Sequence, residues 1–214
     1  MFSNQHEDGA ATPQWLFDLL DAQVQELTGQ RFQLDAAACA WNAKCARYFD
    51  EETDALKQDW SRWSPVFCNA PFSATLISQF AAKALEAAAK GSTVVMMLPS
   101  WPGYPWFQQL KRRGQTQDII GPVAFEKADG SKVVLNIGRN THLVVVTLGP
   151  KVAPGTNGEA IGKANVGESV GEGRPTPHSQ AEETSPTGRH HAVYLDGGRA
   201  PAEGEVPGPG DRFR

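Results

Sequence analysis

Apolar residues recur at helical spacing in three stretches of the first 150 positions. The first stretch, residues 12–28, opens with Thr12 and Pro13, which predict an N-cap and a first helical position. Residues 74–90, rich in Ala and Leu, and residues 105–113 repeat the helical spacing. These stretches predict three amphipathic helices.

Short apolar runs between and after the helical stretches predict strands. Residues 66–68, 93–98 and 142–148 are near-continuous runs, as expected for strands covered on both faces. Shorter candidates are residues 32–35, 119–120, 123–125 and 133–137, the last two joined as a hairpin through Asp129 and Gly130. Residues 36–48 are expected to form a loop and a short helix. The alternation predicts an α/β fold of three layers, with helices on both faces of a sheet.

Polar residues follow three of the predicted strands. Asp35, Asn69 and the pair Pro99-Ser100 each come directly after an apolar run. Ligands of such sheets bind at the carboxyl ends of the strands. We therefore expect these residues to line one crevice.

The composition changes sharply near residue 150. Residues 151–214 contain 12 of the 21 glycines and 7 of the 15 prolines, with few large apolar side chains. Such a segment cannot bury enough surface to offset the entropy of ordering. We therefore divide the chain into a folded domain over residues 11–150 and a disordered tail over residues 151–214. His190 and His191 lie in the tail, where solvated imidazoles are more common than a metal site, so no metal is expected.

Charge and cysteine content narrow the class of protein. The net charge is −4, so nucleic-acid binding would need a local basic patch. Cys39, Cys45 and Cys68 form no CxxC pair, which fits a reducing cytoplasm and argues against a disulfide scaffold or a cysteine zinc site. The sequence shows no apolar run of about eighteen residues and no signal peptide, so neither a membrane span nor secretion is expected.

The tetrapeptide Asn69-Ala70-Pro71-Phe72 resembles the catalytic loop of enzymes that methylate the exocyclic amine of adenine, and chemistry explains its residue types. The amide oxygen of Asn69 and the carbonyl of Ala70 can accept the two N–H groups and draw the nitrogen toward a tetrahedral geometry. Pro71 stiffens the loop, and Phe72 can stack on a base, an interaction of about 1–3 kcal/mol. In isolation, the same residues also fit a strand end followed by a proline turn.

The order and spacing of further motifs give this tetrapeptide a context. They are Thr12-Pro13-x-Trp15-Leu16-Phe17, Leu34-Asp35-Ala36-Ala37-Ala38, Asn42-Ala43-Lys44-Cys45, Arg47-Tyr48-Phe49, Asp54-Ala55-Leu56 with Asp59-Trp60, and Trp106-Phe107. Over residues 11–150 this arrangement resembles the phage-type, Dam-like DNA N6-adenine methyltransferases. The resemblance implies an S-adenosylmethionine-dependent enzyme with a Rossmann-like core. It also implies action on double-stranded DNA in the cytoplasm of a bacterial host or phage-infected cell.

The resemblance implies roles for individual residues as well. The catalytic loop around a flipped adenine would be formed by Asn69, Ala70, Pro71 and Phe72. Contacts to S-adenosylmethionine would come from Thr12, Pro13, Asp35, Ala36, Ala37 and Asp54. Asp35 could instead cap a helix, and Asp54 could be a solvated member of the acidic run that precedes it. Trp60 and Trp63 are expected to pack in the core rather than stack on a base.

Two departures from the family pattern bear on activity. Ala70 replaces the usual first proline of the catalytic loop, which keeps the carbonyl but removes one rigid ring. The loop after Asp35 lacks the Gly-x-Gly of many methyltransferases. In addition, the short spacing between Asp35 and Asn69 leaves little room for the usual second and third strands, so we expect an abbreviated core.

DNA contacts are expected from the densest basic cluster of the folded part, Lys111, Arg112 and Arg113. These residues could bind phosphates, or they could simply favour the C-terminal end of a helix. Lys132 and Arg139 are weaker candidates. The aromatic loop at residues 100–105 could cover the flipped base. The recognition sequence and the oligomeric state are left open.

Two alternatives stand beside a DNA adenine methyltransferase. The same loop chemistry serves adenine in RNA and planar amides in proteins. Alternatively, Ala70 and the low-complexity tail fit a catalytically weakened, nucleic-acid-binding remnant of the family.

Overall fold

The computed structural model of the protein describes residues 10–134 and 142–162. The other residues, which include Arg139, His190 and His191, lie outside this description. The predictions made for those three residues therefore stay predictions.

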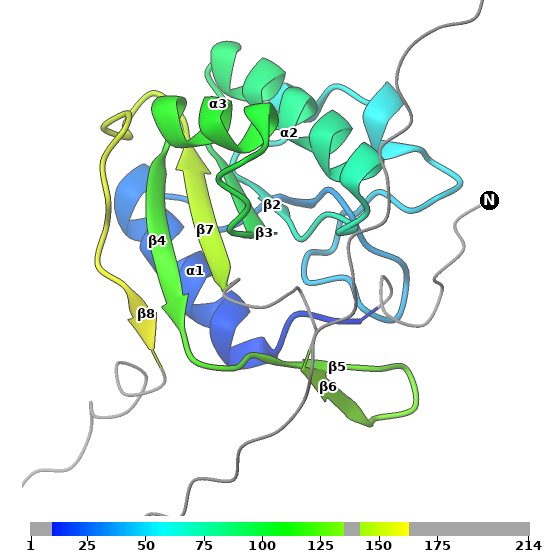
Figure 1. Ribbon diagram of the computed structural model, residues 1–214. Helices are drawn as coiled ribbons and strands as arrows, with labels where there is room; N and C mark the ends of the chain where they lie inside the picture. Colours follow the sequence, from blue (N-terminus) through cyan, green and yellow to red (C-terminus); the bar gives the residue numbers. More distant parts are fainter. Residues whose placement is uncertain (1–9, 135–141, 163–214) are drawn as a thin grey trace, which may run out of the picture. The chain divides into compact units, whose positions relative to one another are not determined.

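Six strands form a central sheet (Figure 1). They are β1 (Leu34–Asp35), β2 (Val66–Cys68), β3 (Val94–Pro99), β4 (Gln115–Ile120), β7 (Leu143–Leu148) and β8 (Ile161–Gly162), in the spatial order β1-β2-β3-β7-β4-β8. β1, β2 and β3 are parallel neighbours, whereas β7 runs antiparallel between β3 and β4. Consequently β4 points the same way as β3. The ends of β1, β2, β3 and β4 meet at one edge of the sheet, here termed the carboxyl edge.

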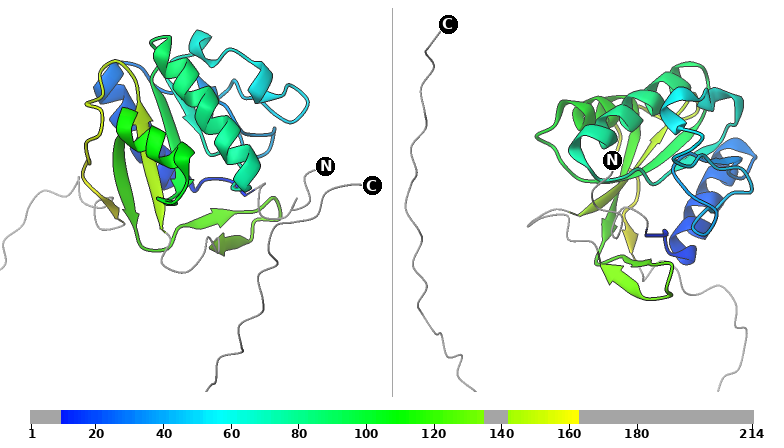
Figure 2. Two further views of the ribbon diagram at one scale, coloured as in Figure 1. Left: turned by 45° about the horizontal axis from the view of Figure 1, so that its top comes forward. Right: turned by 90° about the vertical axis from the view of Figure 1, so that its right-hand side faces the viewer.

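Helices cover both faces of this sheet (Figures 1 and 2). α1 (Gln14–Thr28) packs on one face, and α2 (Ala74–Ala89) and α3 (Pro105–Arg113) pack on the other. Two short 3₁₀ helices, η1 (Ala55–Lys57) and η2 (Trp60–Arg62), precede β2. The predicted three-layer α/β arrangement is confirmed. None of the described helices combines the length and apolar character needed to cross a membrane.

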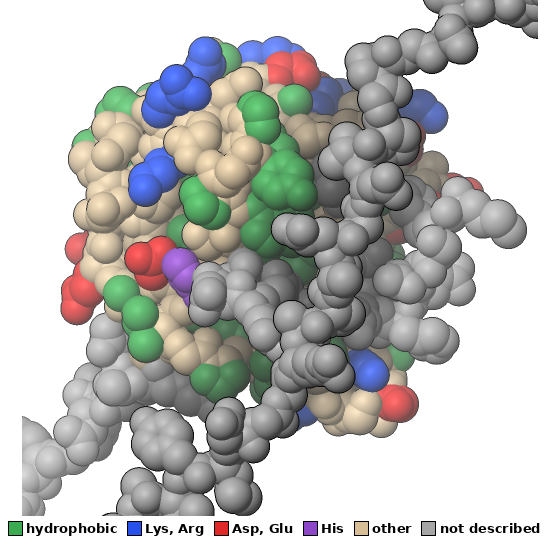
Figure 3. All heavy atoms as spheres, viewed as in Figure 1, with side chains coloured by type: hydrophobic (Ala, Val, Ile, Leu, Met, Phe, Trp, Pro, Cys, Tyr) green, Lys and Arg blue, Asp and Glu red, His purple; other side chains and the backbone are tan. Residues whose placement is uncertain are grey.

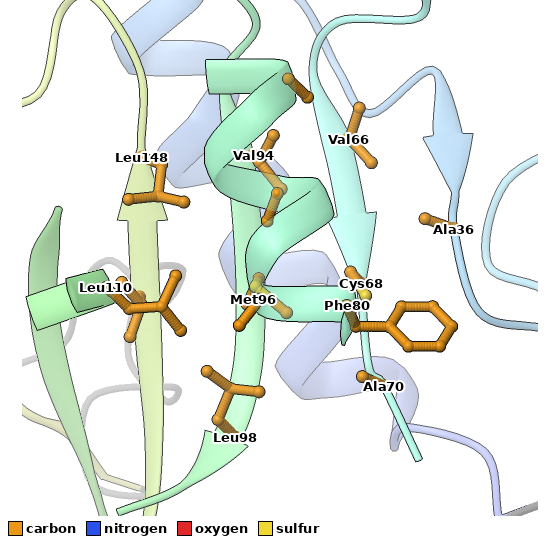
Figure 4. Packing of buried hydrophobic residues seen from close by; sticks show 14 of the residues in the cluster. Ala36, Val66, Cys68, Ala70, Phe80, Val94, Met96, Leu98, Leu110 and Leu148 are labelled. Atoms are coloured by element: carbon orange, nitrogen blue, oxygen red, sulfur yellow. The ribbon is translucent and has the colours of Figure 1, made fainter. Parts of the chain in front are cut away.

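Successive residues of β3 point to opposite faces, as strand geometry requires. Val94, Met96 and Leu98 face α2 and α3, where Figure 4 shows them between the neighbouring strands. Val95 and Met97 face α1. All five side chains are buried, and burial of each stabilises the fold by about 1.5–3 kcal/mol. β3 is therefore a strand covered on both faces, and its end helps to define the carboxyl edge.

A separate hairpin lies beside the start of α1. β5 (Ala124–Glu126) pairs antiparallel with β6 (Lys132–Val134), which confirms the predicted hairpin. Ala11 exchanges two backbone hydrogen bonds with Glu126, of 2.7 and 3.0 Å. The hairpin thus holds the chain in an extended conformation just before the helix.

This extended pairing makes α1 begin one residue later than predicted. Pro13, not Thr12, is the N-cap residue, with φ −61° and ψ 140°. Its carbonyl accepts from the backbone N–H groups of Leu16 and Phe17, at 3.0 and 3.2 Å. At this N-cap no side chain makes a capping hydrogen bond. The predicted stop at Gly29 is confirmed, since this residue adopts a left-handed conformation with φ 83°.

The helix expected within residues 36–48 does not form. Apart from a turn in which Asn42 and Ala43 both donate to the carbonyl of Cys39, the hydrogen bonds at the two ends of this segment run to β1 and β2. The N–H of Asp35 donates to the carbonyl of Arg47, and the N–H of Phe49 donates to the carbonyl of Asp35, both at 3.0 Å. The segment therefore returns along the outer side of β1.

The folded part extends past the predicted boundary at residue 150. The backbone N–H of Gly155 donates to Gly114, and that of Gly158 donates to Thr116, at 2.9 and 2.8 Å. β8 then pairs in parallel with β4 and buries Ile161. Residues 151–162 thus run along β4 and end in a strand of the sheet, and the tail prediction applies only from residue 163 onward.

Candidate active site

The carboxyl edge brings together the strand ends that the sequence singled out. Asp35 ends β1 and pairs with Phe67, which lies two residues before Asn69 at the end of β2. Ser100 follows β3, and its backbone N–H donates to the carbonyl of His142 at 2.8 Å. These strand ends therefore share one edge of the sheet, and the expectation that they line one crevice stays a prediction.

Asp35 organises the loop that follows β1. Its side chain is buried, with the residue 2% exposed. Oδ2 accepts from the backbone N–H of Lys44 at 3.0 Å, and Oδ1 accepts from that of Ala37 at 3.4 Å. The alternative that Asp35 caps a helix is wrong, because turns and bends follow it.

Burial dominates the electrostatics of Asp35. Desolvation raises the pKa of its carboxyl to about 6, although the hydrogen bonds from Lys44 and Ala37 act in the opposite direction. A cationic group placed nearby would favour the charged form and reverse part of this shift. At neutral pH the side chain is a buried carboxylate that gains from a positively charged ligand.

The start of α1 lies against this loop. The Nζ of Lys44 donates to Oε1 of Gln14 at 3.1 Å, so the first turn of the helix contacts the segment held by Asp35. Thr12 and Pro13, directly before that turn, are buried. Ala36 is fully buried next to Asp35. The structure therefore brings five of the six predicted cofactor residues, Thr12, Pro13, Asp35, Ala36 and Ala37, to adjoining segments.

Asp54 is placed differently from these residues. It caps η1 with a left-handed backbone, φ 51°, and accepts from the backbone N–H of Leu56. Its carboxylate pairs with Lys57 at 2.9 Å, and that hydrogen bond is the main cause of a lowered pKa. Among the described residues, neither a hydrogen bond nor an ion pair joins Asp54 to Asp35 or Asn69.

Asn69 presents an acceptor that the fold leaves unused. Its Oδ1 is buried and has no hydrogen-bond partner among the residues that the structure describes. A buried acceptor left unpaired costs about 1–3 kcal/mol. Ala70 is 2% exposed at the end of β2 (Figure 4), and none of the described residues donates a hydrogen bond to its carbonyl. Two neighbouring oxygen atoms are therefore available to a ligand that carries N–H groups.

Phe72 lies where the two hydrophobic cores meet. Its half-buried ring packs against the core under α2 and α3 and also against the core under α1. Pro71 connects it to the two acceptors. The ring is thus fixed by contacts on both faces of the sheet.

An aromatic cluster follows β3 at the same edge. The ring centroid of Trp106 lies 6.2 Å from that of Trp101, 6.1 Å from that of Tyr104 and 5.7 Å from that of Phe107. The Nε1 of Trp106 is buried and has no hydrogen-bond partner in the described part of the chain. The sequence indicated an aromatic loop here, but it gave no sign that this N–H would be left without a partner.

The basic residues predicted to contact DNA lie at the other end of α3. Lys111, Arg112 and Arg113 form its exposed last turn. The next strand starts at Gln115, which pairs with Thr147 near the start of β3. In Figure 3, basic side chains gather over this end of the helix layer. The structure therefore does not bring the cluster to Asn69, and its role in phosphate binding stays a prediction.

Two tryptophans that precede β2 serve packing, as predicted. Trp60 is fully buried, and its Nε1 donates to the carbonyl of Ala55 at 2.8 Å. Trp63 is half-buried, with the guanidinium of Arg47 3.4 Å above its ring centroid.

Cysteine chemistry does not explain the site. Burial raises the pKa of the Cys45 thiol to about 12, and Asp35 and Asp21 raise it further. Burial also holds the pKa of Cys68 well above its ordinary value, and Figure 4 shows this side chain in the core, as predicted. Thiols with raised pKa values are poor nucleophiles. Within residues 10–134 and 142–162, moreover, no three His, Cys, Asp or Glu residues are grouped to hold a metal ion.

Comparison with known proteins identifies a family of methyltransferases. The family described as DNA N-6-adenine-methyltransferase (Dam) matches residues 2–149. A curated relative, the DNA N-6-adenine-methyltransferase of Escherichia phage T1, is 26% identical over 173 residues, which cover 78% of this chain and 67% of the relative. No solved structure matches the chain. Since the family match spans more than half of the sequence, the chain belongs to the Dam family of DNA N-6-adenine-methyltransferases.

Proposed function

We propose that this protein transfers a methyl group from S-adenosylmethionine to N6 of a flipped adenine in double-stranded DNA. We also propose that its sheet is an abbreviated Rossmann-like core, with both ligands at the carboxyl edge. Family membership supports the reaction class. The observation that carries the proposal is the buried, unpartnered Oδ1 of Asn69, next to the free carbonyl of Ala70.

The two oxygen atoms fit the N6 amine of adenine. That amine has two N–H donors and a lone pair that is delocalised into the ring. Oδ1 of Asn69 and the carbonyl of Ala70 would each accept one N–H, which satisfies both acceptors at once. Holding the amine in this way localises its lone pair and makes the nitrogen a better nucleophile. Because the acceptors belong to the protein, they are positioned before the base arrives.

The residues near β1 fit the methyl donor. S-adenosylmethionine would supply a methyl group made electrophilic by a positively charged sulfur. The Asp35 carboxylate would accept from the α-amino group of the donor, which would relieve the electrostatic cost of its own burial. Ala36 and Ala37 allow the backbone to approach closely. Thr12 and Pro13 would line the methionine end, and Asp54 would contact the adenine amine or ribose of the donor.

Aromatic residues would hold the base and exclude water. Phe72 would stack on the adenine, while the loop after β3, with Trp101 and Tyr104, would cover it. Lys111, Arg112 and Arg113 would contact DNA phosphates farther along the duplex.

The test is methyl transfer by purified protein from tritiated S-adenosylmethionine to unmethylated duplex DNA, followed by nucleoside chromatography. The wild type should yield N6-methyldeoxyadenosine, and Asn69→Ala should lose at least about 100-fold in kcat while it still binds the donor. Asn157→Ala is the matched control, because the Asn157 side chain accepts from Thr116 Oγ1 at 2.8 Å beside β4, which two strands separate from β2. Full activity in Asn69→Ala would reject the mechanism.

The same assay separates the alternative substrates. Label should enter the DNA fraction and not RNA or protein. Label in the RNA or the protein fraction would identify that molecule, and not DNA, as the substrate. Donor binding without any transfer would identify a binding remnant of the family, for which the loss of a proline at Ala70 offers a reason.

A further inference from the structure

Two buried side-chain atoms lack a partner in the described part of the chain, and they are complementary in their hydrogen-bonding type. Among the described residues, Asn69 Oδ1 and Trp106 Nε1 are the buried side-chain nitrogen or oxygen atoms without a hydrogen bond. One is an acceptor and the other is a donor. They lie on segments that follow the adjacent strands β2 and β3, at the carboxyl edge. Trp106 belongs to the same hydrophobic core as Ala70 and Leu98.

The Trp106 ring is held in one place. The residue is 9% exposed, in the first turn of α3. Three aromatic rings surround it, and Phe107 meets it edge to face at an interplanar angle of 88°. Its N–H is therefore a donor with a fixed position.

A second buried tryptophan, Trp60, has a partner for the same donor. Trp60 Nε1 donates to the carbonyl of Ala55 at 2.8 Å. Buried indole N–H groups normally find a partner, because an unpaired buried donor is costly. The missing partner of Trp106 therefore points to a ligand with an acceptor atom.

We propose that Trp106 Nε1–H donates a hydrogen bond to a ring nitrogen beside the amine of the target adenine, and so helps the enzyme to select adenine. The inference rests on the proposed function and deepens it. Adenine presents an N–H donor at N6 next to an acceptor, N7 on one side and N1 on the other. An acceptor from Asn69 and a donor from Trp106 match that pattern.

Guanine would not satisfy the same pair. It has an acceptor, O6, where adenine has its amine. Oδ1 of Asn69 would then face another oxygen. The mismatch at Asn69 therefore discriminates between the two purines. The hydrogen bond from Trp106 holds the base in the orientation in which that mismatch is felt.

The experiment combines one protein change with single-atom changes in the base. Duplexes carrying adenine, 7-deazaadenine or 1-deazaadenine at the methylated position are compared as substrates for the wild type and Trp106→Phe. Phenylalanine keeps an aromatic ring but has no N–H. On adenine, Trp106→Phe should lower kcat/KM about tenfold. One of the two deaza bases should cost the wild type a similar factor, and that cost should vanish in Trp106→Phe.

Additive losses for both deaza bases would overturn the inference, since they would mean that Trp106 does not contact either ring nitrogen. So would unchanged kcat/KM in Trp106→Phe. Trp60→Phe is the matched control, because it also removes a buried indole donor. It should lower the melting temperature without changing the ratio of adenine to deazaadenine activity.

A binding measurement separates failure of this inference from failure of the proposed function. Fluorescence anisotropy measures the affinity for a duplex with one bulged adenine, 7-deazaadenine or 1-deazaadenine, with no methyl transfer required. If the wild type transfers no methyl group but its preference for bulged adenine is lost in Trp106→Phe, the base contact stands and the catalytic function falls. If the protein methylates DNA but Trp106→Phe keeps the wild-type preference, the function stands and the inference falls.

Discussion

The carboxylate of Asp35 accepts a hydrogen bond from the backbone N–H of Lys44, nine positions later, at 3.0 Å. One buried side chain therefore shapes the loop after β1 and provides the negative charge of the candidate cofactor site. Burial disfavours the charged form of this carboxyl group in the folded protein, whereas a cationic ligand would favour it. The pH dependence of stability and that of ligand binding should consequently run in opposite directions.

Stability should decrease as Asp35 ionises. The pKa of this carboxyl is raised from 3.8 to about 6 in the folded protein, so the contribution is fully present below the unfolded-state pKa and is lost as pH rises through 6. The stability of the wild type relative to Asp35→Asn should therefore fall by about 3 kcal/mol from pH ~3.5 to pH ~7.5. Chemical denaturation of both proteins across this range measures the difference. A difference that stays constant with pH would refute the assignment.

Affinity for S-adenosylmethionine should change in the other direction. The ammonium group of the donor stabilises the charged carboxylate, so the dissociation constant should rise about tenfold for each pH unit below the Asp35 pKa. Titration calorimetry between pH 5 and 8 measures this dependence. Asp35→Asn should bind weakly at all these pH values and lose the dependence. Asp50→Asn, which alters a carboxylate that accepts from the backbone N–H of Thr53, should behave like the wild type.

Restoring the ring at position 70 should strengthen the loop. The backbone N–H of Ala70 donates to none of the described residues, so Ala70→Pro removes no hydrogen bond that the structure shows. Proline reduces the conformational entropy of the unfolded chain, which should raise the free energy of unfolding by about 0.4–1 kcal/mol. The same stiffening of the loop should raise kcat about two- to fivefold. Thermal denaturation and single-turnover methylation measure the two effects. Lower activity at an unchanged melting temperature would show that the loop must move.

The last turn of α3 should influence DNA affinity through charge. If Lys111, Arg112 and Arg113 neutralise three phosphates, replacing all three by alanine should lower the magnitude of the slope of log K against log salt by about 3. A nine-residue helix is about 13 Å long, which is less than one turn of a DNA duplex, so a duplex that runs along α3 would extend past this cluster. Anisotropy titrations from low to high salt give the slope. An unchanged slope would mean that these residues stabilise the C-terminal end of α3 and do not bind phosphates.

Local patterns predicted the buried elements well, because burial on both faces leaves a clear apolar run. Residues 93–98 and 142–148 are examples, and both appear as strands within one residue of the expected bounds. β4 was predicted only at residues 119–120, since its first half reads Gln115-Thr116-Gln117-Asp118. Pairing with β7 holds that half in the sheet, and this contact is not visible in local periodicity.

Composition misplaced the end of the domain for a related reason. Glycine and proline suggested a tail from residue 151, yet the backbone of this segment finds its partners on β4. In the candidate site, too, residue type was visible in the sequence and three-dimensional contacts were not. The acceptors at Asn69 could be predicted from residue type, whereas the unpaired N–H of Trp106 depends on what surrounds the ring in three dimensions.

The position of β7 has a consequence for how the protein is made. β7 separates β3 from β4 in space, although it follows both along the chain. During synthesis on the ribosome, β3 and β4 therefore emerge before the strand that joins them. Until residues 143–148 leave the exit tunnel, both strands have an open edge on which other chains can pair. The half-made protein is thus more exposed to aggregation than the finished one, and a chain interrupted before β7 would lack the middle of its sheet.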